Sequence, residues 1–228
     1  LYAQTKAARG EELSPELAAQ LPASSPDAPW ALGLDAILWM HGAAPGAAEF
    51  VPAALRGRRQ VPFTVGGFVR YAETPVGPYN EVWGSPVGLL HRGLTAATVP
   101  FMVVDSLASI HGGRSNWSLP KSLGTFAWES DTTVRADGES PAGPWSVSAV
   151  ASPKGPAIPF WGPSWLRQLT PGGEALRIGA RGRGMARMAT VRVETTGPSL
   201  PEWLLPGEHV GLVIRRARMR FGPAKRRG

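Results

Sequence analysis

The chain has 228 residues and a formal net charge of +7, and it contains no cysteine. This length suits one large domain or two small ones, and the lack of cysteine excludes disulfide bonds, thiolate metal sites and a cysteine nucleophile. No run of about 18 apolar residues occurs, so we expect no transmembrane helix and no membrane partner. Without a visible secretory signal, a cytoplasmic location is expected.

The composition also predicts the fold class. The 28 glycines and 23 prolines are spread along the chain, which favours many turns between short strands over long helices. Nine tryptophans and seven phenylalanines supply large side chains for a core. We therefore predict an α+β fold that is predominantly antiparallel β with a few short helices.

Metal chemistry is not expected from the histidine positions. None of the four histidines pairs with another at a metal-binding spacing, and no HExxH pattern occurs. We predict no metal site and no cofactor.

Residues 1–29 are predicted to form an N-terminal arm or linker, with a short helix that begins after Ser14 and ends near Gln20. Residues 30–228 are predicted to form a single domain. Its first strand is expected at 30–41.

Two strands on either side of a turn rich in proline and glycine, at 75–78, predict a β-hairpin. Strand alternation places Tyr79, Glu81 and Trp83 on one face of the second strand. Glu81 is then either an inward-facing acid between two aromatic rings or a solvent-facing glutamate on an aromatic edge. The sequence leaves both alternatives open.

The next strand is expected at 95–105, and Asp105 or Ser106 can cap a short helix that ends at Gly112 and Gly113. Lys121 follows this helix, directly after a proline, at the point where a loop is expected to enter a strand.

Apolar neighbours, Trp117 and Leu119 among them, surround Lys121 in the sequence. Burial lowers the pKa of a lysine, and the neutral amine can attack a carbonyl carbon to form a Schiff base. The alternative is an ordinary exposed lysine beside a turn.

The second half of the chain predicts further strands and loops. We expect a hairpin or surface loop at 130–143, a structured loop that covers a pocket at 153–166, and a half-buried antiparallel strand at 189–194. The last strand, 209–221, places Arg216, Arg218 and Arg220 on one face. Such a row protects a sheet edge; nucleic-acid binding is a weaker alternative, because no RNA-recognition or zinc-finger pattern accompanies it.

Two motifs together resemble the acetoacetate decarboxylase family. VGPYNEV at 76–82 resembles its glycine-x-tyrosine-x-glutamate hairpin, and GGRSNWSLPKSLG at 112–124 resembles its later glycine-arginine and proline-lysine motif. The resemblance implies a closed β-barrel-like core and a homo-oligomer. It also implies that Lys121 forms the Schiff base, that Glu81 is an acid of the active site, and that Arg114 orients the substrate or supports the structure.

The chain departs from the decarboxylase pattern at three points. Ser122 stands where decarboxylase members carry a second lysine, and Gly66 stands where they carry a second acid. Their arginine near the first strand has no evident counterpart in the segment 31–39.

The resulting functional hypothesis is a lyase that acts on a keto acid or related carbonyl compound through an imine on Lys121, by decarboxylation or by aldol or dehydration chemistry. Lys121 and Glu81 are the predicted catalytic residues. The predicted substrate-binding residues are Arg114, Tyr79, Trp117 and Trp83. The alternative is a non-catalytic barrel protein that binds a small molecule.

Overall fold

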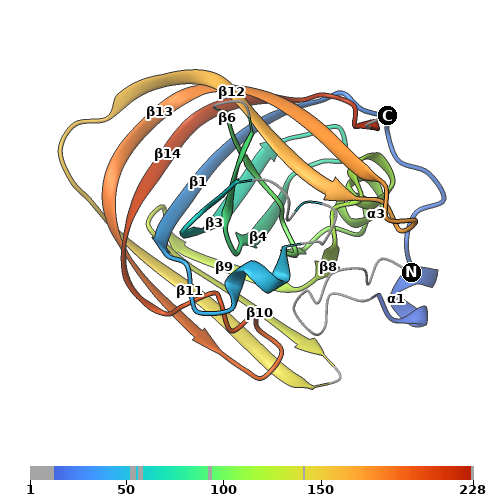
Figure 1. Ribbon diagram of the computed structural model, residues 1–228, viewed down its shortest axis with the longest axis horizontal. Coiled ribbons are helices and arrows are strands. Elements are labelled where there is room, and N and C mark those ends of the chain that lie inside the picture. Colours follow the sequence, from blue (N-terminus) through green and yellow to red (C-terminus); the bar gives the residue numbers. More distant parts are fainter. Residues whose placement is uncertain (1–12, 52–54, 56–58, 92–93, 141, 227–228) are drawn as a thin grey trace.

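The computed structural model describes residues 13–51, 55, 59–91, 94–140 and 142–226. Its described helices are short: α1 (Pro15–Ala19), the 3-10 helix η1 (Ala47–Phe50) and α3 (Leu107–Trp117). The side chain of Ser14 caps α1 by accepting a hydrogen bond from the Leu17 N–H, as the sequence predicts. Apart from a helical position at Leu55, the rest of the regular structure in the described residues is strand (Figure 1).

The strands belong to one sheet, which is antiparallel except for the β12–β6 and β7–β8 pairs. The α+β prediction with mainly antiparallel strands is confirmed. The strands are β1 (Trp30–Gly42), β2 (Arg59–Val61), β3 (Phe63–Glu73), β4 (Tyr79–Ser85), β5 (Gly88–His91), β6 (Leu94–Ala97), β7 (Phe101–Val104), β8 (Lys121–Leu123), β9 (Thr125–Ser130), β10 (Thr133–Ser140), β11 (Gly143–Pro153), β12 (Ile158–Leu169), β13 (Ala175–Thr196), β14 (Gly207–Phe221) and β15 (Lys225–Arg226).

The sheet does not close into a barrel among the described residues. Its main path runs β2-β5-β6-β12-β13-β14-β1-β3-β4-β7-β8, and the two end strands do not pair with each other. Figure 1 shows this path as a strongly curved surface, with α3 at one end of it. The closed barrel that the family resemblance implies is therefore corrected to an open, curved sheet.

Strand alternation divides the core into two parts. On β1 and β3 one set of side chains packs in a cluster that contains Ile37, Trp39 and Phe68. The alternate set, which includes Leu34, Val69 and Tyr71, packs in a second cluster. This second cluster also receives α3, and it surrounds the cavity described below.

Two elements differ from the sequence prediction. The segment expected as a loop over a pocket contains strand β12, whereas the hairpin alternative for 130–143 is confirmed, because β10 pairs antiparallel with both β9 and β11. Prolines 159 and 163 are compatible with β12 because β12 pairs with β13 on one side and, on the other, only two of its residues pair with β6. Helix α3 continues past Gly112 and Gly113 and ends at Trp117, and the capping residue Ser118 adopts a left-handed conformation with φ of 53°.

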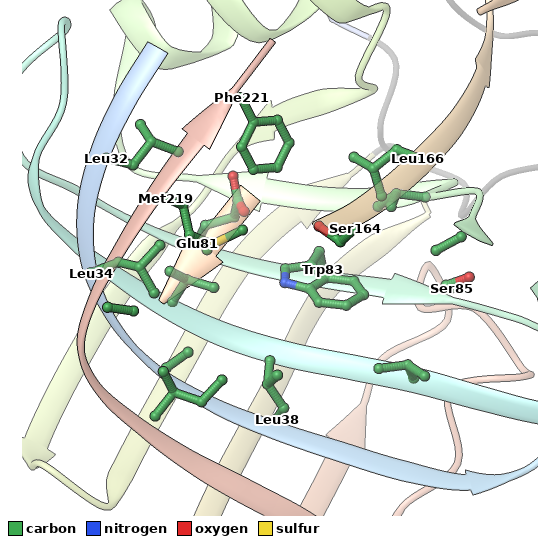
Figure 2. Close-up of a pocket in the computed structure, with 18 of the residues that line it drawn as sticks. Leu32, Leu34, Leu38, Glu81, Trp83, Ser85, Ser164, Leu166, Met219 and Phe221 are labelled. Atoms are coloured by element: carbon green, nitrogen blue, oxygen red, sulfur yellow. The ribbon is translucent and has the colours of Figure 1, made fainter. Parts of the chain in front are cut away.

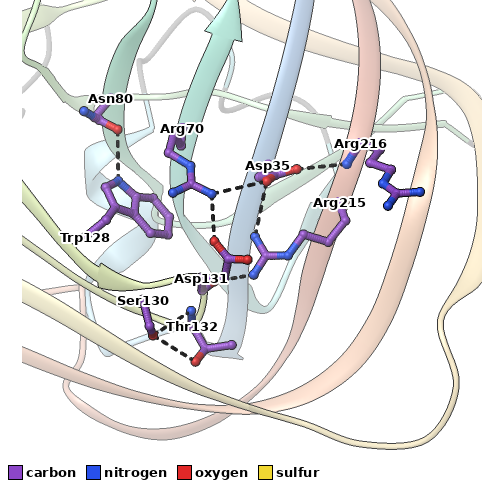
Figure 3. Close-up of polar contacts among 9 residues, drawn as sticks. All are labelled: Asp35, Arg70, Asn80, Trp128, Ser130, Asp131, Thr132, Arg215 and Arg216. Carbon is purple, nitrogen blue, oxygen red and sulfur yellow. Dashed lines mark hydrogen bonds and ion pairs between the residues drawn. The ribbon is translucent and has the colours of Figure 1, made fainter.

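Strand β14 is central in the sheet, between β13 and β1. The arginines at 216, 218 and 220 therefore do not protect an edge, and that interpretation is wrong. Asp35 binds this strand at a bulge: its carboxylate accepts a 2.8 Å hydrogen bond from the N–H of Arg216, and it contacts Arg70 and Arg215 (Figure 3). Arg216 has φ of 51°, which an L-residue adopts only where the surroundings favour it.

The segment between Leu13 and Trp30 lies against α3. The Asn116 side chain accepts a 2.9 Å hydrogen bond from the Ala28 N–H and donates one of 3.0 Å to the Pro26 carbonyl. The first twelve residues of the expected arm lie outside the described residues, and the division at residue 29 stays a prediction.

None of the helices in the described part of the chain is long and apolar enough to span a membrane. The same residues contain no group of three or more His, Asp or Glu side chains arranged to hold a metal ion.

Candidate active site

A cavity of about 800 Å³ lies against the inner face of the curved sheet. Its walls come from β1, β3, β4, β12 and β14, together with Trp117 at the end of α3 and Lys121 on β8. Figure 2 shows Glu81 inside this cavity among aliphatic and aromatic side chains. Labelled wall residues are Leu32, Leu34, Leu38, Trp83, Ser85, Ser164, Leu166, Met219 and Phe221.

Lys121 is the first residue of β8, so the predicted transition from loop to strand is confirmed. Lys121 is only 2% exposed to solvent. The Nζ atom lies 2.8 Å from Oε2 of Glu81, and it donates hydrogen bonds to the hydroxyl groups of Ser109 (2.9 Å) and Tyr79 (3.2 Å). The exposed-lysine alternative is wrong.

Glu81 lies on β4 and points into the cavity, at 3% exposure. The hydroxyl of Tyr71 on β3 donates a 3.1 Å hydrogen bond to Oε1. The solvent-facing alternative for Glu81 is therefore excluded. One carboxylate oxygen binds the Tyr71 hydroxyl while the other binds the ammonium group of Lys121, which fixes the carboxylate in place.

The charge state of Lys121 differs from the sequence expectation. Burial, the largest single influence, lowers the pKa of Lys121, but the nearby Glu81 carboxylate and the Tyr79 hydroxyl together outweigh it. The pKa of Lys121 is consequently raised above its ordinary value of 10.5, where burial alone would have lowered it. Lys121 is an ammonium ion at rest.

The two tyrosines remain protonated phenols at neutral pH. Burial raises the pKa of Tyr71 and that of Tyr79, and the negative charge of Glu81 adds to the rise in both cases. Their rings lie 4.5 Å apart, and Nζ of Lys121 lies 4.7 Å from the Tyr79 ring centroid. The phenol groups can therefore donate hydrogen bonds near the carboxylate without adding negative charge.

Helix α3 makes room for the lysine through a glycine. A Cβ atom on Gly113 would lie 2.6 Å from Cδ and 2.7 Å from Cε of Lys121, distances too short for any side chain. A residue larger than glycine would displace the lysine stem from this position.

The other predicted site residues lie around the cavity in different roles. Tyr79, Trp83 and Trp117 line it. Arg114 is buried on α3, where its Nε donates a 2.7 Å hydrogen bond to the Lys121 carbonyl, and it is not among the lining residues. The family resemblance left two roles open for Arg114, and this position fits the structural role better than substrate orientation.

Sequence reasoning missed two residues of the site, Tyr71 and Ser109. The hairpin register pairs Tyr71 with Tyr79, so extending the hairpin prediction by one pair would have located the first. Ser109 lies four residues before Gly113 on α3 and therefore on the same helix face. That spacing falls inside the helix expected from the sequence, so this signal was already present there.

Two of the departures from the decarboxylase pattern lie away from the cavity. A Cβ atom on Gly66 would point at the Trp39 indole, in the other core cluster. Ser122 follows Lys121 in an extended strand, so its side chain points to the opposite face, and it does not line the cavity. A lysine at 122 or an acid at 66 would not face the Lys121 ammonium group on this backbone.

The sequence matches the family model described as acetoacetate decarboxylase over residues 17–148. No curated protein matches the sequence significantly. The match covers more than half of the chain and includes both motifs.

Solved structures share the fold at low sequence identity. An acetoacetate decarboxylase has a TM-score of 0.68 and 15% identity, with 94% of this chain and 98% of that chain covered. An acetoacetate decarboxylase-like enzyme from Sphingomonas wittichii RW1 has a TM-score of 0.60 and 16% identity, with 97% and 100% covered.

The enduracididine biosynthesis enzyme MppR, solved with pyruvate, has a TM-score of 0.62 and 12% identity, with 90% of this chain and 92% of that chain covered. The buried lysine and glutamate lie on the two motifs within the matched region. On the family match and this common fold, the chain belongs to the acetoacetate decarboxylase family.

Proposed function

We propose that the protein is a Schiff-base enzyme with lyase-type activity, which acts on a keto acid or related carbonyl compound through Lys121. The observation that carries the proposal is the contact of 2.8 Å between the only lysine and the only carboxylate among the described lining residues of a mainly apolar cavity. Membership of the family supports a lyase-type activity. The structure of MppR with pyruvate supports a small carbonyl ligand.

The first step is proton transfer within the buried pair. Oε2 of Glu81 accepts a proton from Nζ of Lys121, which leaves a neutral amine beside a neutral acid. The amine attacks the carbonyl carbon, and one N–H proton passes to the carbonyl oxygen to give a carbinolamine. Glu81 then protonates the departing hydroxyl, which leaves as water, and an iminium ion remains on Lys121 beside the regenerated carboxylate.

The iminium ion withdraws electrons from the neighbouring carbon atom. Loss of carbon dioxide, a proton or an aldehyde fragment there leaves an enamine on Lys121, and protonation of the enamine followed by hydrolysis releases the product. Tyr71 holds the Glu81 carboxylate in position, and Ser109 and Tyr79 hold the amine. Trp83 and Trp117 contribute cavity wall that contacts the substrate body.

Borohydride trapping tests the proposal. The protein is incubated with a panel of aldehydes, ketones and keto acids, reduced, digested and analysed by mass spectrometry. A covalent adduct is expected on Lys121, and Lys121→Met should lower its yield at least about a hundredfold. Lys154→Met is the matched control, because Lys154 is exposed, and it should leave the yield unchanged. The proposal fails if no panel member gives an adduct on Lys121.

A second candidate is non-catalytic binding of an apolar small molecule. It is favoured by one observation: three groups already bind Nζ of Lys121 at rest, and the cavity wall is mainly apolar. Saturable binding of an uncharged ligand to both the native protein and Lys121→Met, with no adduct in the trapping assay, would support this candidate over the enzyme.

A further inference from the structure

The charges close to Lys121 bear on which carbonyl compounds can reach it. Four of the described residues that line the cavity carry ionisable groups. Lys121 and Glu81 form an ion pair, and Tyr71 and Tyr79 are phenols. No arginine and no second lysine stands among these described lining residues. The one cation is already bound to the one carboxylate.

The carboxylate of an α-keto or β-keto acid lies within two carbon atoms of the carbonyl carbon that Nζ attacks. Such a carboxylate must therefore enter the same few ångströms that Glu81 occupies. Burying an ion without a partner of opposite charge is unfavourable, and a second carboxylate beside the first adds repulsion. The iminium charge formed on Lys121 is compensated by Glu81 and is not free to bind the incoming acid.

The strand register shows which side chains face the pair. Ala36 and Val69 lie in one cross-strand row with Glu81, and Leu34 and Tyr71 lie in the next row with Tyr79. All of these side chains line the cavity. Beside Glu81 the surface is thus aliphatic or phenolic, and an uncharged, apolar substrate body can pack against it without losing hydrogen bonds to water.

We propose that the substrate of this site is an uncharged aldehyde or ketone with an apolar body, and that charged keto acids are excluded by Glu81 and the aliphatic wall. This inference rests on the proposed function and narrows its substrate class. It makes loss of carbon dioxide an unsuitable reaction for this member, since that reaction requires a carboxylate on the carbon atom beside the carbonyl carbon. Aldol cleavage or condensation and dehydration of a β-hydroxy carbonyl compound require none.

The test compares carbonyl compounds that differ only in charge. Acetoacetate is compared with methyl acetoacetate, and pyruvate with methyl pyruvate, in the borohydride assay; benzylacetone serves as the uncharged apolar probe. Each adduct rate on Lys121 is divided by the rate of the same compound with a simple amine in solution, which removes differences in intrinsic reactivity. The esters and benzylacetone should exceed the acids by about a hundredfold after this correction.

A gain-of-function variant tests the cause. Leu34→Arg places a cation one row from Glu81. It should raise the corrected adduct rate of acetoacetate, relative to that of methyl acetoacetate, at least tenfold. Leu38→Arg, also one row from Glu81 but on its other side, replaces it if the first variant does not show the native circular dichroism spectrum. Lys154→Arg is the control and should leave the ratio unchanged.

The outcomes separate the two proposals. The inference about charge would be overturned if the acids reacted as fast as their esters. It would also be overturned if a folded arginine variant did not change the ratio of acid to ester adduct rates. Either result would leave the Schiff-base proposal standing. No adduct on Lys121 with any charged or uncharged probe would overturn the proposed function itself.

Discussion

At the scale of single residues, the site depends on a buried ion pair whose members come from different motifs. Glu81 raises the pKa of Lys121 because its carboxylate, 2.8 Å away, stabilises the ammonium form in a region that excludes water. In the proposed mechanism, the nucleophile therefore forms by proton transfer inside the pair and does not come from a lysine that is neutral at rest. Removing one partner of such a pair leaves the other charge buried alone.

Replacement of Glu81 by glutamine tests this coupling. The raised pKa of Lys121 means that the pair stabilises the fold fully below the ordinary pKa of 10.5, and that this stabilisation is lost as the pH rises through the folded-state pKa. Glu81→Gln should lower the free energy of unfolding by about 3 kcal/mol near neutral pH. Denaturant unfolding is measured for both proteins between about pH 8 and pH 11. The difference in unfolding free energy between the native protein and Glu81→Gln should become smaller above the ordinary lysine pKa.

Glu208→Gln is the matched control for that measurement. Glu208 also pairs with a cation, Arg192, but both side chains are more than 60% exposed. This substitution should change the unfolding free energy little at any of these pH values, because exposed ion pairs contribute little. Equal effects of the two substitutions would contradict a special role for the buried pair.

Gly113→Ala tests whether the position of the lysine depends on the helix backbone. The new methyl group would occupy the space of Cδ and Cε of Lys121, so Nζ should move away from Ser109 and Glu81. Adduct formation should fall at least tenfold. The unfolding free energy should change by less than about 2 kcal/mol, because alanine favours the helix by about 1 kcal/mol over glycine.

Ser115→Ala is the control for this prediction, since Ser115 is on the exposed side of the same helix. It should leave the adduct yield unchanged. An undiminished yield in a folded Gly113→Ala protein would show that the lysine stem can occupy another path.

At the scale of elements, the bulge between β1 and β14 shapes the cavity wall. Two residues of β14, Arg215 and Arg216, lie opposite the single residue Asp35 of β1. The extra residue changes the strand parity, so that Ile214 and Ala217 both line the cavity although regular alternation would place them on opposite faces. The Asp35 carboxylate supports the bulge by accepting the Arg216 N–H.

Asp35→Ala should therefore affect both the stability of the protein and the shape of the cavity wall at the bulge. We expect the unfolding free energy to fall by about 1 kcal/mol, which is typical of a lost hydrogen bond to a charged group that is partly exposed. Asp35→Asn keeps an acceptor for the Arg216 N–H and should lose less. Thermal unfolding of the two variants tests this order, and an alanine variant as stable as the asparagine variant would show that the bulge needs no side-chain support.

At the scale of the whole molecule, the cavity is completed by segments that lie far apart in the sequence. Trp30 forms part of the cavity wall, and its ring meets Trp117 edge-on with centroids 5.0 Å apart. The chain just before Trp30 is held to α3 by Asn116.

The homo-oligomer and the cytoplasmic location stay predictions, and sedimentation analysis would test the first.

Asn116→Ala should weaken the attachment of the N-terminal segment. Two hydrogen bonds that join residues about 90 positions apart are lost, and we expect the unfolding free energy to fall by about 1–2 kcal/mol. Protease cleavage between residues 13 and 29 should become faster than in the native protein. Asn80→Ala lies elsewhere on the sheet and should not affect cleavage there; equal rates in Asn116→Ala and the native protein would contradict the prediction.

Local pattern was enough to predict much of this protein. The hairpin that carries Glu81, the helix cap at Ser106 and the strand start at Lys121 are confirmed, because each depends on residues close in the sequence. The same reasoning failed for β12, whose prolines indicated a loop. Its strand conformation depends on pairing with β13, which local sequence does not reveal.

The amino-acid sequence by itself determined the family, the mainly antiparallel fold class and the two residues of the proposed chemistry, since short motifs and strand alternation carry that information. Only the tertiary structure decided that the sheet is open and that Lys121 is charged at rest, because sheet closure and pKa depend on which distant groups meet. It also decided that Ser122 and Gly66 face away from the cavity. The direction in which a side chain points follows from the register of its strand, and that register is set by partners elsewhere in the chain.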